Sequence, residues 1–197
     1  YFDLYRFTFN KEEEQRLTYN SRLISPVYNK SLNNIVAITS YDGTSNIMIS
    51  TNIDNIDDSL YFKPITQLDN GIQLLSLAWH KDDLLVDGVY HQGRQVYKVD
   101  MDNGKLKLIT SGRWENRDQN TTSDGLIYTT DKSGINNLVL SKDGKEKYIT
   151  NVTGGAFMPS ITNNGMILYS LYEDGKYNIA VLDNYTTIDN ELVGYDG

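Results

Sequence analysis

The chain has 197 residues and a formal net charge of −8, from 18 basic and 26 acidic side chains. This acidic balance argues against nucleic acid or an anionic membrane as a partner, because both require a surplus of Lys and Arg. The absence of cysteine excludes disulfides and thiolate metal sites. No stretch approaches the roughly 18 apolar residues of a membrane-spanning helix, so no membrane insertion is expected.

The chain opens on a segment in which apolar and polar side chains alternate, residues 1–10, and this predicts a β-strand. The segment has no initiator Met, so we interpret the sequence as part of a longer protein and draw nothing from the missing signal peptide.

Four later landmarks are pairs of an aliphatic residue and a threonine, spaced 48, 44 and 40 residues apart. They are Leu17-Thr18, Ile65-Thr66, Ile109-Thr110 and Ile149-Thr150. Each pair is followed by a short apolar run, then by a turn signal that ends in glycine, then by an alternating strand. These last strands begin at Asn46, Gln95, Asn137 and Asn178, which are 49, 42 and 41 residues apart.

Two independent landmarks therefore give one repeat of about 40 to 49 residues, and no segment shows the sustained apolar periodicity of a helix. One four-stranded sheet per repeat is typical of a β-propeller blade, whose two apolar faces are buried by its neighbours. The sequence predicts an all-β propeller with four recognisable blades, part of a larger ring. The expected units are 16–50, 65–100, 108–141 and 149–183, with residues 1–10 as the last strand of a preceding blade. A β-sandwich is the alternative fold.

The repeat resembles that of TolB-like propellers, which are related to WD repeats. The fourth unit carries the resemblance best, through Ile149-Thr150, Gly154-Gly155-Ala156-Phe157-Met158-Pro159, Asn164-Gly165 and Tyr177-Asn178-Ile179. The Ser-Pro-Asp-Gly turn of that repeat is degraded in all four units, which indicates a distant branch. Such repeats also form non-catalytic domains of prolyl-oligopeptidase-like and tricorn-like peptidases, so the resemblance implies a fold more firmly than a function.

Catalysis is not expected within this segment. His80 and His91 are the two histidines, and both fall at predicted turns. No Gly-x-Ser-x-Gly elbow is present to supply a serine nucleophile.

No cofactor and no metal site is predicted. Acidic residues cluster at Asp54-Asp57-Asp58, Asp82-Asp83 and Asp100-Asp102. The Asp100 loop offers oxygen ligands to Ca²⁺ but lacks the later Glu of an EF-hand, and Asp-Asn-Gly is an ordinary turn sequence.

The candidate binding residues lie just before or on the first strand of each unit, because in a propeller these segments line the axial channel and one mouth. The segment from Arg113 to Asp118 stands out, because Trp and Arg are the most frequent binding anchors. The alternative is that Trp114 is a core aromatic of its blade, as expected for Trp79. The predicted anchors are Arg22, Arg113, Trp114, Glu115, Arg117 and Phe157.

The sequence thus favours a non-catalytic binding or scaffold propeller of a bacterial envelope protein, periplasmic or surface-exposed, that recognises a protein or peptide at one mouth of the ring. We expect the rest of the parent chain or a second copy to complete the ring. The alternatives are a substrate-gating propeller of a peptidase with its catalytic domain elsewhere, and a carbohydrate-binding propeller.

Overall fold

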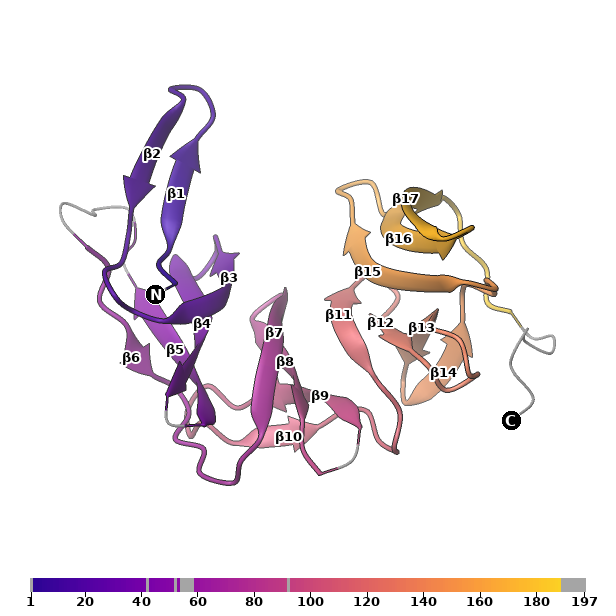
Figure 1. Ribbon diagram of the computed structural model, residues 1–197, viewed down its shortest axis with the longest axis horizontal. Helices are drawn as coiled ribbons and strands as arrows, with labels where there is room; N and C mark the ends of the chain where they lie inside the picture. The colour runs from indigo at the N-terminus through magenta and orange to yellow at the C-terminus, as the bar shows by residue number, and fades with distance from the viewer. Residues whose placement is uncertain (1, 42, 52, 54–58, 92, 189–197) are drawn as a thin grey trace. The chain divides into compact units, whose positions relative to one another are not determined.

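The computed structural model describes residues 2–41, 43–51, 53, 59–91 and 93–188 (Figure 1). Every regular element in this part of the chain is a β-strand, and no helix there is long and apolar enough to cross a membrane. The predicted all-β class is confirmed. The acidic cluster Asp54-Asp57-Asp58 and the turn residues Asp42 and Gln92 lie outside the described residues.

The strands form five sheets in which chain neighbours are also sheet neighbours. The two-stranded sheet pairs β1 (Tyr5–Thr8) with β2 (Glu13–Arg16). The first four-stranded sheet contains β3 (Leu23–Asn29), β4 (Asn34–Tyr41), β5 (Thr44–Thr51) and β6 (Lys63–Pro64). The second contains β7 (Gln73–His80), β8 (Asp83–Val89), β9 (Arg94–Val99) and β10 (Leu106–Leu108).

The third four-stranded sheet contains β11 (Arg117–Thr121), β12 (Leu126–Thr130), β13 (Asn137–Lys142) and β14 (Lys145–Tyr148). The last sheet has three strands within the described residues, β15 (Gly155–Ile161), β16 (Ile167–Glu173) and β17 (Lys176–Leu182). Four successive meander sheets are the arrangement expected of propeller blades.

The chain divides into two compact units, Tyr1–Val86 with Lys98–Lys107, and Asp87–Tyr97 with Leu108–Gly197. The division passes through the sheet β7–β10. In the first unit, β7 packs against β3, β4 and β5. In the second, β15 packs against β11, β12 and β13. Each unit therefore buries a sheet face against a neighbouring strand, as repeat proteins do.

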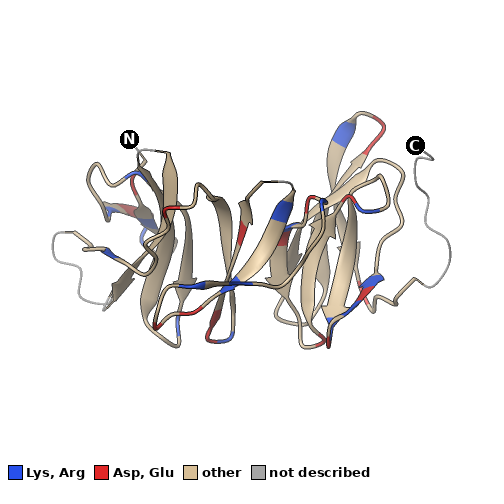
Figure 2. Cartoon of the chain, turned by 90° about the horizontal axis from the view of Figure 1, so that it is seen from below, with Lys and Arg blue, Asp and Glu red and all other residues tan. Residues whose placement is uncertain are grey.

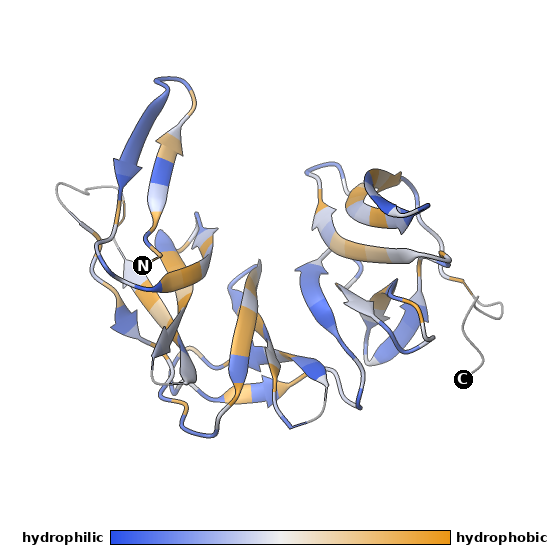
Figure 3. Cartoon of the chain, viewed as in Figure 1, coloured by the Kyte–Doolittle hydropathy of each residue, from blue (hydrophilic) through white to orange (hydrophobic). Residues whose placement is uncertain are grey.

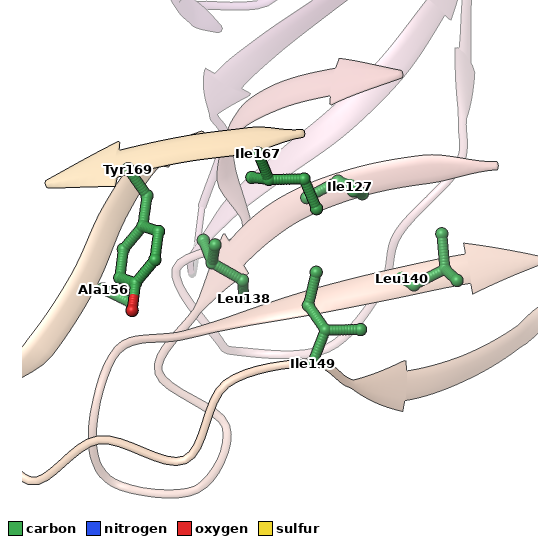
Figure 4. Packing of buried hydrophobic residues seen from close by; sticks show 7 residues of the cluster. All are labelled: Ile127, Leu138, Leu140, Ile149, Ala156, Ile167 and Tyr169. Atoms are coloured by element: carbon green, nitrogen blue, oxygen red, sulfur yellow. The ribbon is translucent and has the colours of Figure 1, made fainter. Parts of the chain in front are cut away.

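The core of the second unit joins its two sheets (Figure 4). Leu138 and Ile127 from one sheet meet Ile167, Tyr169 and Ala156 from the other.

The polar strands β2 and β11 stand out as hydrophilic in Figure 3, and acidic and basic residues are interspersed along the chain in Figure 2. The alternation of burial along β16 follows from the two-residue period of a strand.

A repeated hydrogen-bond motif explains the aliphatic-threonine pairs. The threonine hydroxyl accepts the backbone N–H of an apolar residue near the start of the strand that precedes the outermost one. It donates to the polar side chain just before that residue. We call this motif the threonine latch. Its N–H to Oγ1 distances are 2.9 Å for Leu4 to Thr18, 2.9 Å for Ile47 to Thr66, 2.9 Å for Val96 to Thr110 and 2.7 Å for Leu138 to Thr150.

The aliphatic partner completes the latch through its backbone. Its N–H donates to the carbonyl of the same apolar residue, at 2.8 Å from Leu17 to Leu4 and 2.9 Å from Ile149 to Leu138. Each latch therefore fixes the chain just beyond an outermost strand to the strand beside it. The predicted units begin at the latches, where the preceding sheet ends, but their predicted ends at 50, 100 and 141 leave the outermost strands β6, β10 and β14 between units. The assignment of residues 1–10 as the last strand of a preceding blade stays a prediction. Within the described residues, the Leu4 latch gives β1 the position that β5, β9 and β13 have in their sheets, so β2 takes the outermost position of its sheet.

Candidate functional site

The segments expected to line the channel and mouth are residues 19–22, 69–71, 113–118 and 153–157, and they lie directly before or at the start of β3, β7, β11 and β15. These are the first strands of their sheets. In the second unit β11 lies against β15, which brings the segments from Arg113 and from Thr153 to neighbouring strands. The register of β11 and of β15 is broken by a bulge, at Arg117/Asn120 and at Phe157/Ser160. β3 has the same irregularity at Ile24/Val27, so the bulge is a shared feature of these first strands and redirects their side chains.

Hydrogen bonds of its backbone fix the loop before β11, so the side chains of Arg113, Trp114 and Glu115 are available for other contacts. The Trp114 carbonyl accepts the Arg94 N–H at 3.2 Å and the Gln95 Nε2–H at 3.0 Å. Arg113 stacks on the indole of Trp114, with 4.9 Å from guanidinium carbon to ring centroid. Trp114 is half-buried and lies outside the described core clusters, while Arg113 and Glu115 are exposed. A fixed backbone that presents an aromatic side chain suits recognition, since little order has to be gained on binding.

A buried cluster of charged side chains contacts the start of β11. The carboxylate of Asp87 on β8 has no exposed surface, and both its oxygens accept from Arg94 Nη2 at 2.9 Å. The backbone N–H of Asp118 donates to the same carboxylate at 3.1 Å. Asp87 therefore joins β8, β9 and the bulge of β11. None of this cluster was expected from the sequence, although an aspartate after the apolar run Leu84-Leu85-Val86 is a signal that could have found it.

Asp118 adds a second carboxylate beside Asp87 and Arg94. Burial raises the pKa of its carboxyl group, and the guanidinium groups of Arg117 and Arg94 oppose that shift. Its Oδ2 accepts the Met158 N–H at 3.4 Å, which links β11 to β15. The ionised form of Asp118 is thus less favourable in the folded chain than in the unfolded one.

This shift predicts a pH dependence for Asp118→Asn. A raised folded-state pKa gives a stabilising contribution that is complete below the unfolded pKa of about 4 and is lost as the pH rises through the folded value. We expect Asp118→Asn to lack this loss, so its stability relative to the native chain should rise from pH 4 to pH 7. Urea unfolding at four pH values across that range measures it. A difference that is flat or falls with pH would contradict the assignment.

Arg117 and Phe157 form the second cation–π pair of the site. The guanidinium carbon of Arg117 lies 5.2 Å from the Phe157 ring centroid, and its Nε lies 3.7 Å from Asp118 Oδ2. That buried Nε–H makes no hydrogen bond within the described residues. The Phe157 ring also meets Tyr177 edge-on at 6.1 Å. It lies over Gly155, where a Cβ would stand 2.5 Å from the ring, so glycine is needed beneath Phe157.

Five of the predicted anchors, Arg113, Trp114, Glu115, Arg117 and Phe157, belong to the second unit. Arg22 belongs to the first unit, so the structure does not join it to the other five. Arg22 is exposed, its guanidinium carbon lies 5.9 Å from the Tyr41 ring centroid, and it lines a pocket with Phe2, Ile24 and Ser40.

The two histidines, the Asp100 loop and Trp79 are the other residues that the sequence singled out. His80 ends β7, and His91 lies against the Tyr90 ring with centroids 3.9 Å apart. The carboxylate of Asp100 accepts N–H groups of its own loop, from Asp102 at 3.0 Å and from Asn103 at 3.2 Å, which lowers its pKa. Within the described part of the chain, no three His, Cys, Asp or Glu side chains gather to hold a metal ion. Trp79 is half-buried on β7, and its buried Nε1 has no hydrogen-bond partner among the residues that the structure describes.

These sheets define a β-propeller repeat protein. No family model matches the sequence, and no curated protein matches it. Solved structures are similar in fold at low sequence identity. TolB from Acinetobacter baumannii has a TM-score of 0.71 and 16% identity over 89% of this chain and 45% of that one.

A putative TolB from Agrobacterium tumefaciens has a TM-score of 0.74 and 16% identity, over 94% of this chain and 73% of that one. A puromycin hydrolase has a TM-score of 0.69 and 11% identity, over 91% of this chain and 31% of that one. The predicted TolB-like propeller fold is confirmed. The chain spans less than half of the A. baumannii TolB and about a third of the hydrolase.

Proposed function

We propose that the chain is a non-catalytic propeller module that binds a protein or peptide at the surface formed by Arg113, Trp114, Glu115, Arg117 and Phe157. The observation that carries the proposal is a pair of arginine–aromatic stacks, Arg113 on Trp114 in the loop before β11 and Arg117 on Phe157 between the neighbouring strands β11 and β15.

Both stacks use residue types that dominate binding energy at protein interfaces. A glutamate between two arginines gives the surface both signs of charge and so favours a ligand of mixed polarity. By analogy with the TolB proteins of similar fold, we further propose that the module acts in a bacterial envelope, periplasmic or surface-exposed. Further propeller units, from a longer chain or from a second copy, would complete the array of sheets.

A random peptide library displayed on phage tests the binding surface. We expect peptides selected on the native chain to bind Trp114→Ala and Arg117→Ala at least tenfold more weakly, since each substitution removes an anchor of about 2 kcal/mol. Tyr61→Ala, which removes a highly exposed aromatic side chain from the first unit, is the matched control and should bind like the native chain. Selected peptides that bind all three variants equally would refute the proposed site.

A second function is favoured by one observation, the similarity in fold to a puromycin hydrolase and to prolyl endopeptidases. In that case the module would gate substrate access to a peptidase domain. The adjoining sequence in the full reading frame decides between the two, because a gating propeller requires a nucleophile elbow or zinc-binding motif beside it. Binding of the chain to sugars on a glycan array would instead support a carbohydrate-binding propeller.

A further inference from the structure

The outer edge of the last sheet differs from the corresponding edge of every other sheet. Within the described residues, β17 pairs with β16 alone, whereas β5, β9 and β13 each have a strand on both sides. Ile179 on β17 is 84% exposed. Tyr177 and Val181, on the same side of the strand, are exposed as well. The unpaired backbone groups along a strand edge are a ready template for another strand, and the exposed apolar face of β17 beside this edge favours burial.

Asn178-Ile179 corresponds in position to the residues held by the threonine latches. Each latch holds a polar residue followed by an apolar one, as in Asn46-Ile47 and Asn137-Leu138. The sheet register agrees, because Leu138 pairs with Thr129 and Ile179 pairs with Ser170 of the preceding strand. The four latched apolar residues, Leu4, Ile47, Val96 and Leu138, are at most 7% exposed.

The described chain after β17 leads away from this edge. The Tyr185 hydroxyl donates to the Asp124 carboxylate at 3.1 Å and lies 3.3 Å from the Thr122 hydroxyl, at the β11–β12 turn. The Ile188 N–H donates to the Tyr148 carbonyl at 2.8 Å, next to β14. Residues 183–188 therefore contact the neighbouring sheet and do not supply a latch partner to Ile179.

We propose that the free edge of β17 binds an extended strand followed by an aliphatic-threonine pair, supplied by a further repeat unit of the same kind. The strand pairs with β17, and the threonine hydroxyl accepts the Ile179 N–H and donates to the Asn178 side chain. The aliphatic residue covers Ile179, as Ile149 does for Leu138. This inference rests on the proposed completion of the array by further units and is independent of ligand binding at Trp114.

A peptide with the sequence of residues 143–152 is the probe, because it contains β14 and the pair Ile149-Thr150 that latches Leu138. With a fluorescent label, its binding to the intact 197-residue chain is measured by anisotropy. We expect saturable binding and a shifted amide resonance of Ile179. Peptide carrying Thr150→Val should bind roughly tenfold more weakly, the factor for one lost buried hydrogen bond. The native peptide should also bind Asn178→Ala more weakly than the native chain.

Four outcomes overturn the proposal: no binding at millimolar peptide, equal binding of the Thr150→Val peptide, equal binding to Asn178→Ala, or sedimentation of the chain as a dimer whose β17 edges pair. The last would identify a second copy as the occupant. Trp114→Ala should bind this peptide as the native chain does, so failure at the Trp114 surface and failure at the β17 edge are separable.

Discussion

Replacement of Asp87 by alanine is expected to lower the free energy of unfolding by about 3–5 kcal/mol, the usual cost of leaving a buried charge without its partner. Asp87 has no exposed surface, and Arg94, its partner, has only 13% of its side chain exposed. The substitution also removes the acceptor of the Asp118 N–H at the β11 bulge. Chemical denaturation of both proteins measures the difference.

Asp83→Ala is the matched control. Asp83 pairs with Lys98 at 2.7 Å, but both side chains are nearly half exposed, so the loss should stay within about 1 kcal/mol. Removal of both charges in Asp87→Ala with Arg94→Leu should recover part of the stability, because no unpaired charge remains. Equal losses for Asp87→Ala and Asp83→Ala would show that the buried pair does not organise the strand ends.

Thr150→Val is expected to lower the free energy of unfolding by about 1–3 kcal/mol, because a buried N–H loses its acceptor while the packing volume is retained. Thr150 is buried, and its hydroxyl joins the Leu138 N–H to the Asn137 side chain. The latch also positions the next segment, since the Val152 N–H donates to Asn137 Oδ1 at 3.0 Å. Denaturant unfolding measures the loss.

Thr153→Val provides the comparison, because Thr153 is exposed and three residues further along the same segment. Its substitution should change the free energy of unfolding by no more than about 0.5 kcal/mol. The other latches allow a second check, in which Thr66→Val and Thr110→Val cost amounts similar to Thr150→Val. A negligible loss at all three positions would mean that the aliphatic-threonine pairs mark the repeat without stabilising it.

The repeat could be predicted from sequence because its landmarks are local. Pairs such as Ile149-Thr150 recur at a regular spacing, and so do strand starts such as Asn137-Leu138. The sequence did not show that the two landmarks bind each other, because that contact depends on how a hairpin returns the chain. The predicted units begin at the aliphatic-threonine pairs for this reason. The two-stranded sheet of β1 and β2 was not predicted.

The candidate site was predicted only in part, for a similar reason. Arg113 and Trp114 are adjacent in sequence and stack on each other, and Phe157 meets Arg117 because β11 and β15 are adjacent. The Asp87–Arg94 pair beneath them was missed, since it depends on the approach of β8, β9 and the β11 bulge. Arg22 was grouped with the others by its position in the repeat, but it belongs to the other compact unit.

The account depends most on Trp114 being a contact residue and not part of the core. The free energy of unfolding of Trp114→Ala tests this most directly, because a core aromatic and a surface anchor differ widely in what their removal costs. Since Trp114 is half-buried and outside the described core clusters, we expect a loss of about 1 kcal/mol or less. A loss of about 3–5 kcal/mol, the cost of emptying a core site, would contradict the account.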